Sequence, residues 1–130
     1  MNKSFPKYER LCGVKSIERL HTQGKAFIAY PFRVVFLLVE DESETVPVRT
    51  MVSISKKKLK KAVDRNRVKR LMREAYRLNK SELIEFAETN KLKVHLAFQY
   101  IANEIMSFAE INPKMQKALE KLQENIAEKV

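Results

Sequence analysis

The sequence predicts an α/β (α+β) two-layer sandwich, a small sheet with helices packed on it, and three observations support this prediction. Apolar residues recur at helical spacing in two long segments, 62–80 and 112–129. Segments rich in β-branched and aromatic residues, which are typical of strands, precede or separate them. The chain has 130 residues, of which 45% are hydrophobic, and this suits one compact core. We therefore expect one domain, residues 1–130, with a short flexible N-terminal tail of about residues 1–6.

The first expected elements are a short helix and a strand. The residues that indicate the helix are Ser16, Ile17, Leu20 and His21. Gly24 is expected to end it in a left-handed cap position, which suits glycine. Residues 31–40 are β-branched and aromatic and predict a strand. The acidic segment 40–47 is the expected connection to the next strand.

The second half of the chain predicts two strands and two helices. Residues 46–55 alternate, and the side expected to be buried holds Val46, Val48, Thr50, Val52 and Ile54. The opposite, polar side holds Arg49, Met51, Ser53 and Ser55. A helix at 62–80 follows, then a strand at 91–101. The last helix is expected to begin with Asn112 as its cap and Pro113 at its first position, with Met115, Ala118, Leu119, Leu122 and Ile126 at helical spacing.

The net charge of +10 is concentrated in one fifth of the chain. Between Ser55 and Lys80 lie 12 of the 26 Lys and Arg residues and only 2 of the 16 Asp and Glu residues, so the rest of the chain is neutral. A surface selected only for solubility would intersperse both signs. Such a concentration is typical of a protein that binds a polyanion.

The helix at 62–80 separates into an apolar side and a basic side when successive residues advance by about 100°. The apolar side holds Val68, Leu71, Met72, Ala75 and Leu78. The basic side holds Arg65, Lys69, Arg70, Arg73, Arg77 and Lys80, with Arg67 at its border. Only Asp64 and Glu74 are available for pairing within the helix. A solvated helix face is the alternative, but same-sign neighbours four residues apart favour a polyanion-binding face.

Asn66 lies near the start of this basic helix, where backbone N–H groups lack partners and the helix dipole is positive. Its amide offers both an acceptor and donors, which can contact a phosphate, a sugar hydroxyl or a metal-bound water. The alternative is a local role as a helix cap.

Composition also limits the compartment. The longest apolar run, 34–39, is too short to span a bilayer, and the N-terminus lacks the apolar stretch of a secretory signal. Cys12 is the only cysteine, so no internal disulfide can form. We expect a cytoplasmic protein with no membrane partner.

Residues 53–77, SISKKKLKKAVDRNRVKRLMREAYR, closely resemble the signature of the protein subunit of bacterial ribonuclease P. The matching positions are Ser53, Ser55, Lys56, Lys57, Ala62, Val63, Arg65, Asn66, Arg67, Lys69, Arg70 and Arg73. The order of the elements outside this segment also fits, so the resemblance covers about residues 7–125.

The resemblance implies an accessory, RNA-binding subunit of a ribozyme. In that family a small basic protein assembles with a catalytic RNA that removes the 5′ leader of precursor tRNA by Mg²⁺-dependent hydrolysis, and the RNA holds the catalytic Mg²⁺. The implied partners are that RNA and precursor tRNA, bound by a monomer with one copy per RNA. The implied fold is that of the second domain of ribosomal protein S5. Its β-α-β crossover is left-handed, whereas such connections are nearly always right-handed.

By position, the resemblance assigns two groups of residues. The first would meet RNA backbone or RNA-bound Mg²⁺ and comprises Arg65, Asn66, Arg67, Lys69, Arg70, Arg73, Lys56 and Lys57. Lys60 and Lys61 extend the connecting loop, which is longer and more basic than the family's and is expected to touch further backbone. The second group lines a cleft for the leader and comprises Ile17, His21, Arg33, Val35, Leu37, Ser53 and Ser55. An electropositive, partly apolar groove suits single-stranded RNA.

Two features depart from the family pattern. Ile17 and His21 stand where aromatic residues are usual on the first helix, and Ile17 cannot stack as a phenyl ring does. His21 could stack on a base, but an ordinary surface role is the favoured interpretation. Phe5, Tyr8 and Phe27 could line the cleft or pack in the core, and packing is the favoured interpretation.

Other functions fit the sequence less well. A helix-turn-helix DNA-binding protein needs a helix before the basic helix, but a strand precedes it. A ribosomal-protein-like module or an RNA chaperone with no role in cleavage is the main alternative. The acids that might hold catalytic metals in a protein-only nuclease are Glu40, Asp41, Glu42 and Glu44. They crowd one loop that is typical of a solvated turn, so we expect no catalytic residue and no metal site in the protein itself.

Overall fold

The fold is a four-stranded sheet covered by helices, seen in a computed structural model that describes residues 4–129. The elements in chain order are η1 (Lys7–Glu9), α1 (Val14–Gln23), β1 (Lys25–Ala29), β2 (Phe32–Leu38), β3 (Val48–Ile54), α2 (Ala62–Asn79), α3 (Ser81–Thr89), β4 (Val94–Tyr100) and α4 (Phe108–Ala127). The strand order is β1-β2-β4-β3, and only the β3–β4 pair is parallel.

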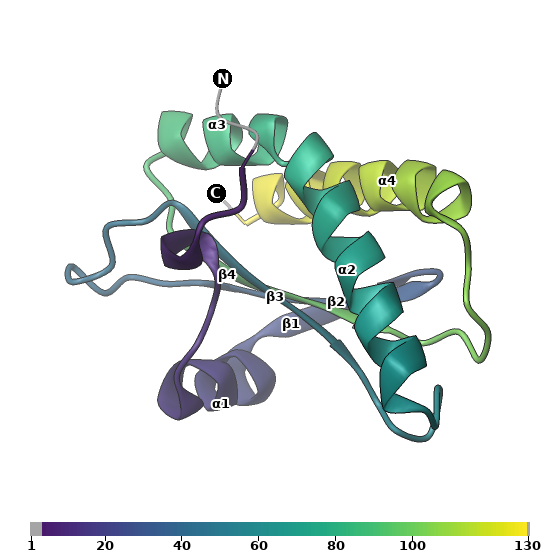
Figure 1. Ribbon diagram of the computed structural model, residues 1–130. Coiled ribbons are helices and arrows are strands. Elements are labelled where there is room, and N and C mark those ends of the chain that lie inside the picture. The colour runs from purple at the N-terminus through teal and green to yellow at the C-terminus, as the bar shows by residue number, and fades with distance from the viewer. Residues whose placement is uncertain (1–3, 130) are drawn as a thin grey trace.

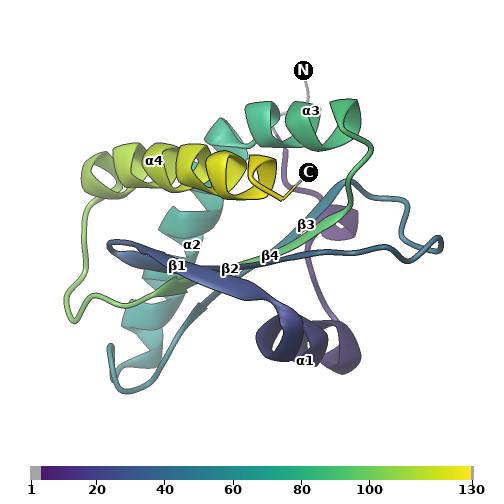
Figure 2. The ribbon, with the colours of Figure 1, turned by 180° about the vertical axis from the view of Figure 1, so that it is seen from behind.

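The helices lie on both faces of the sheet. Figures 1 and 2 show α2, α3 and α4 on one face and α1 on the other. The α/β (α+β) sandwich is thus confirmed, with α1 as partial cover on the second face. The chain leaves β3, passes through α2 and α3 on one face of the sheet, and returns as β4, which is parallel to β3 and beside it. Seen from the helices with both strands pointing upward, β4 lies to the left of β3, so the β-α-β crossover is left-handed, as the resemblance implied (Figure 1).

The face below α2 and α4 forms the main core because alternate residues of three strands point to it. Paired neighbours on this face include Phe32 with Tyr100, and Val34 with Phe98. The expected buried side of β3 is confirmed by Val48, Thr50 and Ile54, which are buried, while Val52 packs partly exposed against the same core.

The start of the chain is fastened to α2 and α3. Phe5, which we placed in a flexible tail, is buried and its ring lies 5.2 Å from that of Tyr76. The Lys80 ammonium donates to the Ser4 carbonyl and to the Glu9 carboxylate, and this ion pair is buried. The tail is therefore packed from residue 4 onward, and residues 1–3 lie outside the described part. Of the other two aromatics considered for the cleft, Phe27 packs against the main core and Tyr8 is exposed.

The sequence did not predict two elements, β1 and α3. The strand Lys25–Ala29 is short and lies at an edge of the sheet, so only Phe27 and Ala29 are half-buried and none of its side chains is fully buried. The helix Ser81–Thr89 follows α2 after one residue, Lys80, which keeps a right-handed helical backbone. Neither glycine nor proline marks this break, so the sequence carried no local signal that a second helix begins after Lys80.

Both expected details at helix ends were wrong. Gly24 does end α1, but its φ is −73° and its backbone is not left-handed. Gly13 is the glycine with positive φ. The last helix begins at Phe108, because Ser107 and Glu110 form a reciprocal capping box. Asn112 therefore lies inside the helix, where its Oδ1 accepts a hydrogen bond from Asn79 Nδ2 at 2.7 Å. Pro113 follows it within α4.

Candidate nucleic-acid interface

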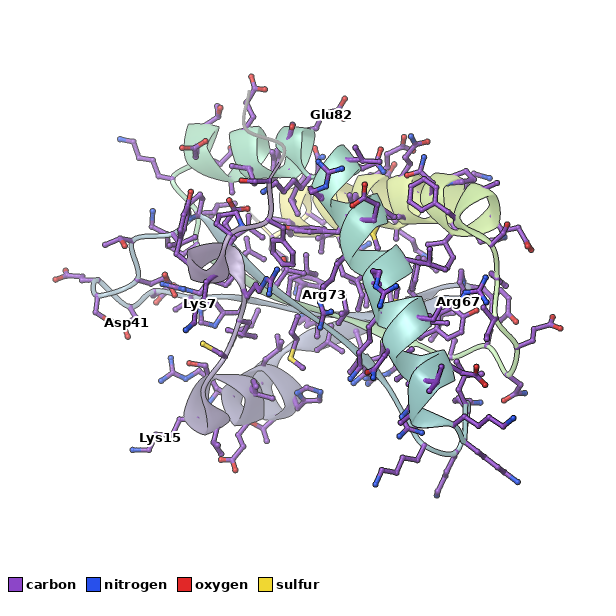
Figure 3. All side chains as sticks on the ribbon, in the orientation of Figure 1. Lys7, Lys15, Asp41, Arg67, Arg73 and Glu82 are labelled. Carbon is purple, nitrogen blue, oxygen red and sulfur yellow. The ribbon has the colours of Figure 1, made fainter. Side chains whose placement is uncertain are left out.

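Helix α2 packs with its apolar side on β3 and α4, and this leaves a basic side in solvent. The buried residues are Val68, Met72, Ala75 and Tyr76. On the other side Arg67, Arg70 and Arg73 are exposed, while Lys69 is half-buried. In Figure 3 the basic side spans the width of α2, with Arg73 at the edge nearer α1 and Arg67 at the opposite edge. Tertiary packing thus separates the two sides as the helical spacing predicted.

Four cations of α2 have no acidic partner among residues 4–129. Among the ion pairs of residues 4–129, none involves Arg67, Lys69, Arg70 or Arg73. We call these four residues the cationic strip. Their charge is therefore uncompensated by neighbours and raises the local positive potential.

Three residues of the predicted basic side, Arg65, Arg77 and Lys80, do not belong to the cationic strip. Lys80 is 1% exposed and pairs with Glu9, so it cannot reach a ligand. Arg77 pairs with Glu74 at 2.5 Å, and this hydrogen bond holds the pKa of the Glu74 carboxyl below its usual value. The cationic strip is consequently shorter than the wheel predicted and ends at Arg73.

Arg65 organises the basic loop that precedes α2. Its Nη1 donates to the carbonyls of Leu59 and Lys60, both at 2.8 Å. The Leu59 side chain is buried in the main core, so the loop is anchored both by this side chain and by the hydrogen bonds from Arg65. The four predicted loop lysines, Lys56, Lys57, Lys60 and Lys61, are exposed. Arg65 therefore holds this loop against the helix start, beside the cationic strip.

Asn66 is exposed one turn inside α2 and is not its cap. The helix begins at Ala62 after Lys61, and no side chain caps it. The Asn66 amide is therefore open to solvent near the positive end of the helix dipole.

The sheet face covered by α1 has polar ends and an apolar middle. Neighbouring residues of β2, β4 and β3 form three rows: Arg33, Gln99 and Ser53; Val35, Ala97 and Met51; and Leu37, His95 and Arg49. The middle row packs under α1 in a small core with Leu20 and Ile17. Val35, predicted to line a cleft, is 2% exposed and supports α1 instead of meeting solvent.

The row nearest the end of β3 carries exposed polar groups. Arg33, Ser55 and His21 are exposed, and Ser53 is half-buried. Arg33 Nη1 donates to Gln99 Oε1 at 2.9 Å, and Gln99 Nε2 lies 3.1 Å from His21 Nε2. Gln99 was missed from the sequence because a single amide in an apolar strand carries no local signal. The structure joins it to two predicted cleft residues from different elements.

The other polar end of this face holds a compact ionic group. Glu44 accepts hydrogen bonds from Arg49 Nε at 2.8 Å and lies 2.9 Å from His95 Nε2. Although burial raises the pKa of Glu44, the bonds from His95, Arg49 and the Val46 N–H hold it below the ordinary 4.5. Cys12 and these groups line a polar pocket of about 280 Å³.

Most of the acidic loop is solvated as expected, with Glu44 as an exception. Asp41 and Ser43 form a local turn in which the Ser43 N–H donates to Asp41 Oδ1 at 2.9 Å. Glu40, Asp41 and Glu42 are exposed, whereas Glu44 is turned inward to Arg49. Among residues 4–129, no cluster of three His, Cys, Asp or Glu side chains could hold a metal ion. No helix in that range is long and apolar enough to cross a membrane.

The fold and this surface define a small basic α+β protein with an uncompensated cationic helix side and a partly covered polar sheet face. The chain belongs to the Ribonuclease P family, whose model matches residues 5–123. It is 39% identical over 120 residues to the ribonuclease P protein component of Porphyromonas gingivalis, covering 92% of this chain and 87% of that one. The protein component of Chlorobaculum tepidum is 35% identical over 105 residues, covering 76% and 68%.

Solved structures agree with the fold. A structure of the Staphylococcus aureus RNase P protein superposes with a TM-score of 0.69 at 21% identity. The match covers 88% of this chain and 94% of that one. A second structure of the S. aureus protein gives a TM-score of 0.59, with coverage of 91% and 92%. The α+β architecture is therefore shared across low sequence identity.

Proposed function

We propose that this chain is the protein subunit of a ribonuclease P ribonucleoprotein, which binds the catalytic RNA and the 5′ leader of precursor tRNA. The observation that carries the proposal is the cationic strip of α2, whose three arginines are exposed and whose four residues have no acidic partners among the described residues. Family membership supports an assembly with RNA, since the relatives are named protein components of ribonuclease P.

In this proposal the cationic strip and the basic loop bind the phosphate backbone of folded RNA. Arginine and lysine neutralise phosphates and release counterions, which provides affinity without sequence preference. Arg65 keeps the loop lysines beside the strip, so both act as one surface. The polar row of the sheet, with His21 and Ser53, lies at the end of β3 that leads into this loop and receives single-stranded leader.

The hydrolysis of the leader is assigned to the RNA with its Mg²⁺, and the protein supplies binding. The side chains of residues 4–129 do not fit a resident metal site, because they form no cluster of three suitable ligands. Asn66 is the residue placed to contact a water on RNA-bound Mg²⁺, through its exposed amide. We further propose that the protein acts in the cytoplasm as one copy per RNA.

The decisive experiment mixes purified protein with precursor tRNA at limiting Mg²⁺, with and without a cognate ribonuclease P RNA. We expect the protein to lower the Mg²⁺ concentration that the RNA needs and to favour precursor over mature tRNA. The protein without the RNA should cut nothing. Leader cleavage by the protein alone, or an unstimulated RNA, would contradict the proposal.

Matched charge variants locate the effect on α2. Replacing Arg67, Arg70 and Arg73 together with alanine should abolish most of the stimulation. Replacing three other exposed cations, Lys7, Lys25 and Lys117, removes the same charge elsewhere and should preserve it. Equal losses in both triple variants would mean that net charge, not the cationic strip, is responsible.

A further inference from the structure

A hydrogen-bonded chain joins α1, β4 and β2 at the polar end of the α1 face. His21 Nδ1 lies 2.9 Å from the Ile17 carbonyl oxygen, and His21 Nε2 lies 3.1 Å from Gln99 Nε2. Gln99 Oε1 in turn accepts from Arg33 Nη1 at 2.9 Å. Arg33 and Gln99 are direct partners across the β2–β4 pair, so the sheet register fixes their relation.

The chemistry of these contacts determines where the protons lie. A guanidinium can only donate, so the Gln99 oxygen must face Arg33 and the Gln99 NH₂ must face His21. That NH₂ can only donate, hence His21 Nε2 accepts and carries no proton. The Ile17 carbonyl can only accept, hence His21 Nδ1 carries the proton. The contacts therefore require the neutral Nδ1–H tautomer of His21.

Both ring nitrogens of His21 are thus engaged in the plane of the ring. The imidazole edge that carries them has no capacity left for a ligand, while His21 as a whole is exposed. A flat ring held in this way offers its face, which suits stacking on an unpaired base. Within residues 4–129 the Arg33 guanidinium donates to Gln99, and Arg33 is exposed, so its other N–H groups can meet a phosphate.

We propose that Gln99 is a positioning residue that joins His21 and Arg33 into one contact for a single unpaired RNA nucleotide. The base stacks on the imidazole, and the phosphate meets the guanidinium. This inference rests on the proposed function, which brings single-stranded leader to this face. It adds that a histidine serves where a phenyl ring is usual because an amide on a neighbouring element fixes its tautomer and orientation.

The tautomer is tested on the protein alone by ¹⁵N NMR of the His21 ring. The wild type should show a protonated Nδ1 and a bare Nε2. In Gln99→Glu one carboxylate oxygen still accepts from Arg33. The other oxygen replaces the NH₂ group that faces His21, and it can only accept a hydrogen bond. His21 must then bring a proton to Nε2, and the Nε2 resonance should move accordingly. Gln123→Glu on α4 adds the same charge on the other face and should leave the ring unchanged. A wild-type ring protonated at Nε2 would overturn the inference.

The contact with RNA is tested by the preference for precursor over mature tRNA, measured as a ratio of affinities with the cognate RNA present. Gln99→Leu should lower this ratio about three- to tenfold, because the ring loses its in-plane partner. The same change in a His21→Phe background should lower the ratio by a smaller factor, since a phenyl ring needs no such partner and only the Arg33 contact is then lost.

The outcomes separate this inference from the proposed function. A wild-type protein without preference for precursor tRNA overturns both. A wild-type preference that Gln99→Leu leaves unchanged overturns the inference alone. Equal losses from Gln99→Leu in the His21 and Phe backgrounds also overturn it, because Gln99 would then act independently of the imidazole.

Discussion

Gly24 lies where the end of α1 meets β2, in a position with little space for a side chain. A Cβ added there would stand 2.3 Å from the Leu20 carbonyl oxygen and 2.9 Å from that of Phe36. Its backbone angle, φ −73°, is open to any residue. At the residue scale, glycine is needed here for the close approach of two backbone segments, which no helical pattern in the sequence reveals.

We expect Gly24→Ala to lower the free energy of unfolding by about 1–3 kcal/mol, because helix or strand must move to admit the methyl group. Urea unfolding followed by circular dichroism measures this change. Gln23→Ala, at the exposed neighbouring position, is the control and should stay within about 0.5 kcal/mol of the wild type. A stable Gly24→Ala protein would show that α1 shifts without cost.

At the scale of elements, α2 combines three functions along its length. Its middle turns present the cationic strip, its apolar side joins β3 and α4, and its end is fastened to the start of the chain through Lys80. The helical wheel placed Lys80 with the RNA-binding cations because it considers only one helix. Glu9, 71 residues earlier in the chain, is the partner that removes it from that surface.

Arg70→Ala should flatten the log–log dependence of RNA affinity on salt by up to about one unit, because one phosphate contact and its released counterion are lost. Filter binding with the cognate RNA across a salt series gives this slope. The stability of the protein should be unchanged, since Arg70 is exposed. An unaltered slope would place Arg70 in solvent in the complex.

Lys80→Met should have the opposite profile. Removing the ammonium leaves the buried Glu9 carboxylate without its partner, which costs about 3–5 kcal/mol of stability. Denaturant unfolding measures this loss, and the salt dependence of RNA affinity in the folded variant should equal that of the wild type. A changed slope with unchanged stability would return Lys80 to the RNA-binding surface.

At the scale of the whole molecule, charge and polarity are divided between surfaces. The excess of +10 lies in the segment that forms the basic loop and α2. The rest of the chain is neutral in sum, and its helices complete the core. A concentrated positive field disfavours self-association through that surface and attracts a polyanion from a distance.

We therefore expect a monomer that binds its RNA in a one-to-one complex. Sedimentation velocity of the protein should give one species near the chain mass of 15.2 kDa. Addition of the cognate RNA should give a single complex that saturates at one equivalent. A dimer at micromolar concentration, or saturation at two equivalents, would contradict this expectation.

Features that depend on residues close in sequence were predictable. The spacing of Val68, Met72 and Ala75 predicted the buried side of α2, and the alternation from Val48 to Ile54 predicted the inner face of β3. Elements with weak local signals were missed, namely the edge strand β1 and the helix α3. At the site, most of the cationic strip was found from its spacing, whereas Gln99 could not be.

The sequence by itself determined the class of fold, the basic side of one helix and the family, because periodicity, charge and a contiguous motif are properties of neighbouring residues. Only the tertiary structure decided which cations are available, which cleft residues are buried, and which side chain His21 contacts. Those features depend on contacts such as Lys80 with Glu9, Val35 under α1, and His21 with Gln99. Folding brings these residues together from distant parts of the chain, and no local pattern encodes their pairing.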